Sequence, residues 1–66
     1  MLKTIIRVTK DDGSYGWVHS IQDTIEITDN EQEALKMDFQ TTLSVALALG
    51  TLKVPHAMIS KFEKDD

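Results

Sequence analysis

The residues that could carry acid, base, nucleophile or metal chemistry are few: two histidines, four serines and a set of carboxylates, with no cysteine in 66 residues. A metal site needs three or four ligands that converge, and His19 and His56 lie far apart in the chain. The acidic run 29–33 lacks the central glycine and the distal glutamate of a calcium-binding loop. The sequence therefore predicts no metal site and no cofactor.

The serines also lack the surroundings of a nucleophile. A catalytic serine needs a base that a third group orients, but Ser20 and His19 are consecutive and would point to opposite faces of a strand. Gly13 and Gly16 stand in a predicted hairpin, not before a helix as a phosphate loop requires. A ligand-sized cavity, about 300 Å³ or more, is also hard to build in so short a chain. We therefore expect no catalytic residues and a protein that is not an enzyme.

Strands and turns are predicted for the first half of the chain. Residues 2–9 are rich in β-branched side chains and roughly alternate in polarity, which indicates a strand with one wetter face. Residues 11–14 are Asp, Asp, Gly and Ser, which are typical of a tight hairpin turn, so a second strand should follow over 15–21. A turn at 22–23 then leads to a third strand that contains Ile25 and Ile27.

Two helices and a last strand are predicted for the second half. Thr28 and Glu31 have the spacing of a capping box, which indicates a short helix that ends near Met37. Asp38 can cap a second helix over 39–49, and Gly50 stands where a left-handed residue often closes a helix. The last strand, 51–62, contains a proline and therefore lies at an edge or bends.

The expected fold is α+β: an antiparallel β-hairpin or meander of three to four strands, packed by one short and one longer helix in the order β-β-β-α-α-β. It forms a single domain over 1–62, followed by a charged tail, 63–66, that is expected to fray. A chain of this length buries only about 60% of the surface that it exposes when unfolded. Without disulfides, association is the main remaining source of stability.

The second predicted helix has no charged residue between Asp38 and Lys53. At about 100° per residue, one apolar side is expected to pack on the sheet: Phe39, Leu43, Ala46, Leu47 and Gly50. The residues that would then face outward, and that are candidates for self-association, are Ser44, Val45, Ala48 and Leu49. Either the rest of the chain covers them, or they meet the same helix of a second copy in a two-fold homodimer.

The net charge of −4 conceals a segregation of charge along the chain. Residues 11–38 hold eight acidic residues against Lys36 alone, whereas residues 1–10 carry three basic residues and no acidic one. Nucleic-acid binding depends on clustered lysine and arginine, so no nucleic-acid partner is expected. The longest apolar run, 45–49, is far too short to cross a bilayer, and no membrane role is expected. The absence of cysteine and of a signal-peptide pattern fits a cytoplasmic protein.

Five residues are candidates for contact with a protein partner. Tyr15 and Trp17 are aromatic residues of the kind enriched at interface hot spots, although a tryptophan in a small domain also serves as core. Asp23, Glu26 and Glu33 could steer the chain toward a basic surface. An acidic surface also simply keeps a small protein in solution.

Between residues 4 and 50 the chain resembles small uncharacterised proteins encoded by phages and prophages of Gram-positive bacteria. The shared features are an aromatic second strand, "YGWVHS", the junction "IEITDN", the segment "EALKMDF" and an alanine-rich helix that ends in glycine. The resemblance implies a cytoplasmic accessory protein and assigns no functional residue.

These observations favour a non-enzymatic, homodimeric accessory domain that binds a host or phage protein. Two alternatives stay open. One is a small-ligand-binding module with a site between subunits near Trp17 and His19, and the other is a structural component of a larger assembly such as a virion.

Overall fold

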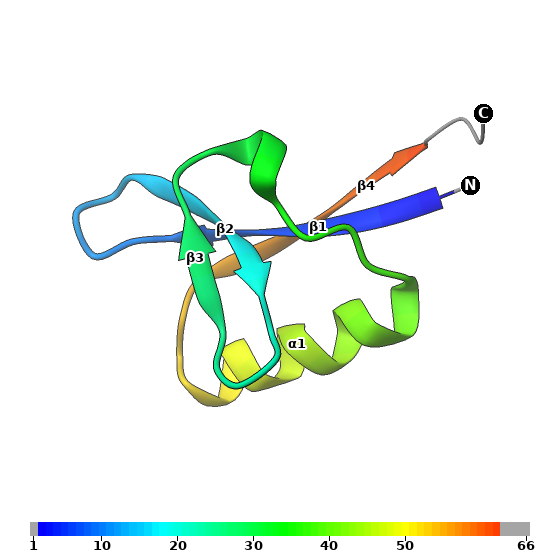
Figure 1. Cartoon of the computed structure of the whole chain (residues 1–66). Helices are drawn as coiled ribbons and strands as arrows, with labels where there is room; N and C mark the ends of the chain where they lie inside the picture. The colour runs from blue at the N-terminus through cyan, green and yellow to red at the C-terminus, as the bar shows by residue number, and fades with distance from the viewer. Residues whose placement is uncertain (1, 63–66) are drawn as a thin grey trace.

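Residues 2–62 are described by a computed structural model, in which four antiparallel strands form one sheet (Figure 1). The strands are β1 (Leu2–Thr9), β2 (Tyr15–Ser20), β3 (Glu26–Thr28) and β4 (His56–Phe62). Their spatial order is β3-β2-β1-β4, because β4 returns to the free side of β1. The α+β class is confirmed, but the sheet is not a simple meander. The charged tail 63–66 lies outside the described residues.

The first hairpin forms at the predicted turn. Gly13 has a φ of 87°, a backbone angle that residues with a side chain rarely adopt. Lys10 N donates to Ser14 O at 2.8 Å and closes the turn. Asp12 Oδ1 accepts from the hydroxyl (2.6 Å) and the backbone N (2.9 Å) of Ser14. These two hydrogen bonds lower the pKa of Asp12, and the bond from the Ser14 hydroxyl has the larger effect. The hairpin register sets Arg7 opposite Trp17.

Strand β2 leaves β1 after three paired residues and turns toward β3. A bulge between Val18 and Ser20 marks this bend. The predicted third strand is confirmed at Ile27 but not at Ile25, which precedes β3. Gly16 lets β3 approach β2, because a Cβ at Gly16 would lie 2.5 Å from Ile27 Cγ2.

The predicted short helix is wrong. Residues Glu31–Glu33 form only one 3-10 turn, η1, capped by Asn30, whose Oδ1 accepts from Gln32 N at 3.0 Å. The capping box is absent as well, since Thr28 Oγ1 accepts from Asn30 N at 3.2 Å. The element order is therefore β-β-β-η-α-β.

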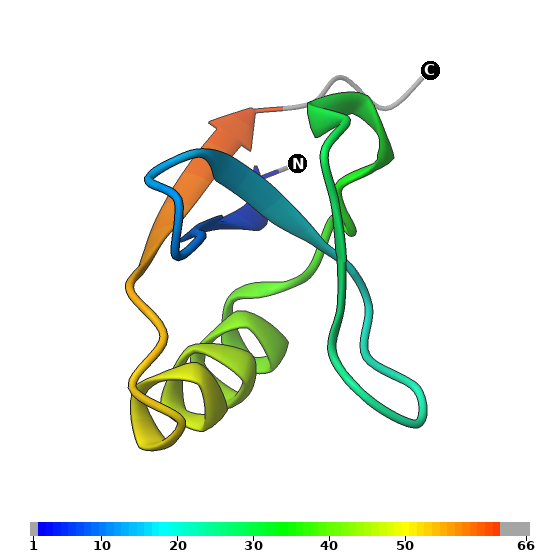
Figure 2. The same cartoon turned by 90° about the vertical axis from the view of Figure 1, so that its left-hand side faces the viewer.

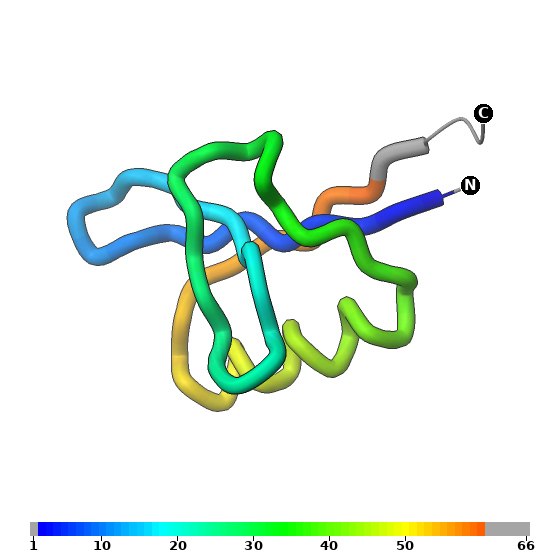
Figure 3. The backbone as a smooth tube through the Cα atoms, in the orientation of Figure 1, coloured from blue at the N-terminus to red at the C-terminus, as the bar shows by residue number. Residues whose placement is uncertain are grey.

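Sheet pairing explains why the helix is missing. Leu35 N donates to Val18 O at 2.7 Å, and Met37 exchanges two backbone hydrogen bonds of 2.9 Å with Thr4. The segment 34–37 thus fills the gap that opens where β2 leaves β1, and Figure 3 shows the chain crossing β1 there. These tertiary bonds outweigh the helix propensity of the segment, which is high because alanine, leucine, lysine and methionine are all good helix formers.

The longer helix, α1 (Phe39–Thr51), begins as predicted, with Asp38 Oδ1 accepting from Thr41 N at 2.8 Å. The bonds from Thr41, and then the charge of Lys3, lower the pKa of Asp38. The predicted end is wrong, because Gly50 lies inside α1 and the left-handed residue is Lys53, with a φ of 59°. The last strand consequently begins at His56, after the proline.

Helix α1 packs beneath β1 and β4 on one face of the sheet (Figure 2). Its buried residues are Thr42, Val45 and Leu49, and the core that they join contains Ile6, Val8, Val18 and Met37. The buried side of the helix is therefore rotated from the predicted one, and of the five residues predicted to pack on the sheet only Ala46 lies against the core. The bridge at Met37 and the cap at Asp38 fix the direction in which the chain enters α1, and this direction turns Val45 inward.

Candidate functional site

Each histidine is tied to a nearby backbone carbonyl. His19 Nδ1 donates to Glu33 O at 2.8 Å, and His56 Nδ1 donates to Val54 O at 2.9 Å. The two residues lie on β2 and β4, with β1 between these strands. Within the described part of the chain, no group of three His, Cys, Asp or Glu residues could hold a metal ion.

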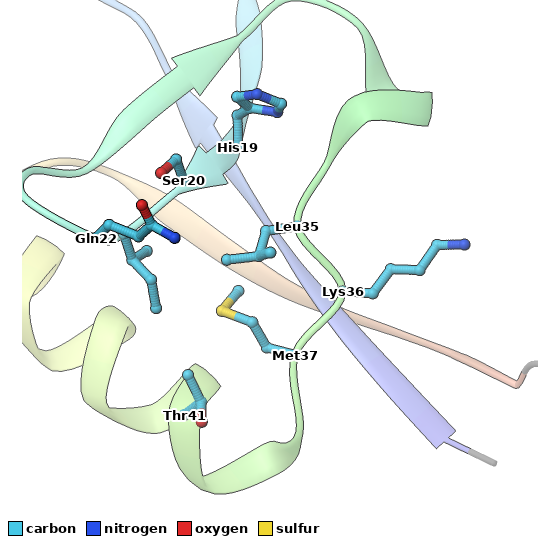
Figure 4. Close-up of a pocket in the computed structure, with 8 residues that line it drawn as sticks. His19, Ser20, Gln22, Leu35, Lys36, Met37 and Thr41 are labelled. Carbon is cyan, nitrogen blue, oxygen red and sulfur yellow. The ribbon is translucent and has the colours of Figure 1, made fainter.

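A surface depression of about 520 Å³ lies between the end of β2, the segment after η1 and the start of α1 (Figure 4). It is larger than we expected from so short a chain. Its lining is apolar in the middle and polar around it: His19, Ser20, Ile21, Gln22, Leu35, Lys36, Met37 and Thr41. Figure 4 shows the Lys36 amine pointing away from the depression.

The side chains of this depression offer contacts to both apolar and polar groups. Its floor of Leu35 and Met37 suits an apolar group, and Gln22 and Thr41 can donate or accept hydrogen bonds. The Nδ1 of His19 donates to Glu33 O, and this bond fixes the orientation of the imidazole ring.

The sheet face opposite α1 carries the predicted aromatic pair. Among residues 2–62 no α-helix covers this face, and η1 lies only along its β2 side (Figure 2). Trp17 is half-buried and faces Arg7 across the strands, and the Arg7 guanidinium lies 4.2 Å from the centre of the Tyr15 ring. Ile5, on the same face, is only 4% exposed. We call Ile5, Arg7, Tyr15 and Trp17 the open sheet face.

Trp17 has properties of both a core and a surface residue. Its ring is half-buried, and its Nε1 is buried without a hydrogen-bond acceptor in the described structure. An unpaired buried donor costs about 1–3 kcal/mol, so packing alone must hold the indole in place. The sequence did not identify Arg7 as part of this face, although the register that follows from the turn at 11–14 sets it opposite Trp17.

The predicted acidic residues do not gather at the open sheet face. Asp23 lies in the β2–β3 turn, Glu26 on β3 and Glu33 in η1, and all three are exposed. Glu33 Oε1 accepts from Thr28 Oγ1 at 3.3 Å. They line the β3 side of the molecule, and an ion pair between Asp29 and Lys10 neutralises part of that side.

The exposed side of α1 carries large apolar residues that the sequence analysis assigned to the core. Phe39, Leu43 and Leu47 are 60%, 44% and 74% exposed, and we call them the α1 stripe. Of the four predicted self-association residues, Val45 and Leu49 are buried in the chain's own core, whereas Ser44 and Ala48 are exposed. A partner of α1 would therefore meet the stripe and not Val45 or Leu49.

Comparison with known proteins gives no relative from which a role could be inferred: no protein-family model, curated protein or solved structure matches the chain. In the described residues, no helix is long and apolar enough to span a membrane.

Proposed function

We propose that the chain is a non-enzymatic protein-binding domain, an accessory protein that acts on a host or phage protein through the open sheet face. The observation that carries this proposal is the sheet face opposite α1, where the exposed Tyr15 and the half-buried Trp17 and Arg7 stand at neighbouring cross-strand positions. Tryptophan, tyrosine and arginine are the three residue types most enriched at interface hot spots.

The arrangement of these side chains also favours binding. Arg7 is held over the ring of Tyr15, so less side-chain freedom is lost when a partner docks. Ile5 beneath them gives the face an apolar floor. The acidic residues on the β3 side, Glu26 among them, would speed the approach of a basic partner without lying at the contact itself.

The proposal is tested with a photo-crosslinking amino acid at position 15, in the cells that make the chain. We expect one discrete adduct with another protein, lost when Arg7→Glu is added. The matched control carries the same group at Gln40, an exposed position on the opposite side of the sheet, and should give no such adduct. Identical adducts from both positions, or none from position 15, would contradict the proposal.

The contribution of the acidic side is tested separately. The triple variant Asp23→Lys, Glu26→Lys and Glu33→Lys should lower capture of the crosslinked partner about tenfold at low salt. The difference should shrink toward about 0.5 M salt, because exposed charges are screened within a few ångströms there. Unchanged capture at low salt would show that these acidic residues do not attract the partner.

The depression of about 520 Å³ supports a second candidate function, the binding of a small ligand. Its volume and its apolar floor with a few polar groups match ordinary ligand sites. A thermal-shift screen of metabolites on the wild-type chain and on Met37→Ala tests this. A ligand that stabilises the first and not the second would support the site, and no stabilising ligand would count against it.

A further inference from the structure

Among residues 2–62, strand β4 has a neighbour on one side only. It pairs with β1 along all seven of its residues, from Leu2↔Phe62 to Val8↔His56, and it stands last in the order β3-β2-β1-β4. The outer side of such a strand presents backbone N–H and C=O groups without partners in the sheet. Natural edges are usually protected by proline, bulges or several charges. Here the proline precedes the strand and Lys61 is its only basic or acidic residue besides His56.

The α1 stripe lies on the same side of the molecule as this edge. Thr41 lines the depression next to β2, so its flank of α1 is turned toward β2. At about 100° per residue, Phe39 and Leu43 fall on the other flank, which is turned toward β4. Figure 2 shows α1 beneath β4 and β1, with β2 and β3 to the other side. Met58 of β4 is opposite Ile6, on the helix side of the sheet, and is 45% exposed.

We propose that a second copy of this chain docks on this side, with β4 antiparallel to β4 and the two α1 helices side by side beneath the joined sheet. One two-fold axis serves both contacts, because it makes the strands and the helices antiparallel together. Helices pack with their axes 8–10 Å apart, and the joined strands would bring the two stripes into facing positions. The proposal uses a surface other than the open sheet face.

The charges at the ends of α1 favour a second copy as the occupant. An axis near residue 45 sets Leu43 opposite Leu47 of the second copy and Asp38 within about one residue of its Lys53. The helix has no other charge between these two positions, so the antiparallel pair joins opposite charges at both ends, whereas a parallel pair would join like charges. The charges at the two ends of α1 are therefore complementary between two antiparallel copies of the helix.

A dimer of so small a chain must bury a substantial share of its surface. A stable interface takes about 800 Å² from each partner, roughly a sixth of the 4857 Å² that this chain exposes. In the proposed dimer, the β4 edge and the adjoining flank of α1 together supply this area. The open sheet face stays accessible in such a dimer, since it lies on the opposite side of the sheet from the helices.

Light scattering over a dilution series from about 100 µM to 1 µM tests the dimer. We expect twice the 7.4 kDa mass of the chain at high concentration, and the mass of one chain for Leu43→Glu. The matched control is Ser44→Glu, which adds the same charge at an exposed position on the other flank of α1 and should stay dimeric. Circular dichroism checks that each variant is folded.

The strand contact has its own readout. Met58→Lys should also give monomers, and hydrogen exchange at the β4 amides of the wild-type chain should slow as concentration rises. This pair of measurements decides the matter if Leu43→Glu does not fold. A monomeric wild-type chain at 100 µM, a dimer that survives both Leu43→Glu and Met58→Lys, or one that Ser44→Glu alone dissociates would overturn the proposal.

Discussion

Asp38 organises the start of α1 through two different groups. Its carboxylate accepts from Thr41 N, and its backbone carbonyl accepts from Thr42 N at 3.0 Å and from Thr42 Oγ1 at 2.6 Å. Thr42 is fully buried, so its hydroxyl needs an acceptor inside the protein. One residue therefore caps the helix and satisfies the polar group that the helix brings into the core.

The cap makes stability depend on pH. Because hydrogen bonds from Thr41 and the charge of Lys3 hold the pKa of Asp38 below its ordinary value of 3.8, the carboxylate stabilises the fold above about pH 4, and this stabilisation is lost as pH falls through the lowered pKa. Asp38→Ala should lower the thermal midpoint at pH 7 by several degrees.

Asp38→Asn is the matched control for this effect. Asparagine caps a helix as well as aspartate does but does not titrate, so the variant should keep most of the midpoint at pH 7 and lose less of it than the wild-type chain between pH 5 and pH 2. The pKa of Asp12 is also lowered. Because Asp12 is present in both proteins, its contribution to the acid sensitivity cancels in the comparison. Equal acid sensitivity of the two proteins would show that Asp38 contributes nothing to the pH dependence.

Gly16 is needed for space and not for backbone freedom. A Cβ there would lie 2.5 Å from Ile27 Cγ2, 3.0 Å from Lys10 Cε and 3.3 Å from Thr28 O. Gly16→Ala should therefore destabilise the fold by about 1–3 kcal/mol, the usual cost of overpacking. In the Ile27→Ala background, where Cγ2 is gone, the same substitution should cost clearly less in urea unfolding. An equal cost in both backgrounds would assign the effect to the strand backbone.

At the scale of elements, α1 shows how a tertiary contact decides an orientation that a pattern leaves open. Apolar residues occupy more than half of its circumference, so both Leu43 and Leu49 fit a core position by periodicity. The bridge between Met37 and Thr4 selects the flank that carries Leu49. The same bridge replaces the predicted short helix with extended chain.

Two leucines of α1 test this orientation directly. Leu49 is 3% exposed and Leu47 is 74% exposed. Leu49→Ala should cost about 2–4 kcal/mol in unfolding free energy because it leaves a cavity, whereas Leu47→Ala should stay within about 0.5 kcal/mol, as expected of an exposed position. Urea unfolding at low micromolar concentration, where association contributes little, is the measurement. The opposite ranking would restore the rotation predicted from the sequence.

The parts of the fold that local chemistry decides were predictable from the sequence. The turn at Gly13, the cap at Asp38 and the alternation along β1 each depend on residues a few positions apart. The rotation of α1 and the extended segment at Met37 depend on contacts between distant residues, whereas the place of Arg7 beside Tyr15 follows from the hairpin register. Tyr15 and Trp17 could be selected as candidates from their residue types alone, whereas the exposure of the α1 stripe was not predicted because its residues resemble core.

At the scale of the whole molecule, the sheet separates two surfaces of different character. One side carries α1 and its stripe, and the other carries the open sheet face with Trp17. The acidic residues follow the β3 side, away from the β4 edge. A dimer formed through β4 would therefore leave both the aromatic and the acidic surfaces of each copy free, so the two proposals are compatible.

The order in which parts of the sheet unfold follows from the positions of its strands. Strand β1 is paired with β2 and Met37 on one side and with β4 on the other, whereas β3 is a three-residue edge. Amides such as Thr4 N should therefore exchange with solvent only on global unfolding, and those of β3 by local opening. The informative amide is Met37 N, which lies in no strand but donates to Thr4 O at 2.9 Å. Hydrogen exchange followed by NMR should group it with β1, because the segment 34–37 fills the sheet where β2 leaves it; exchange as fast as that of the exposed turn at 22–24 would mean that this segment is not part of the sheet.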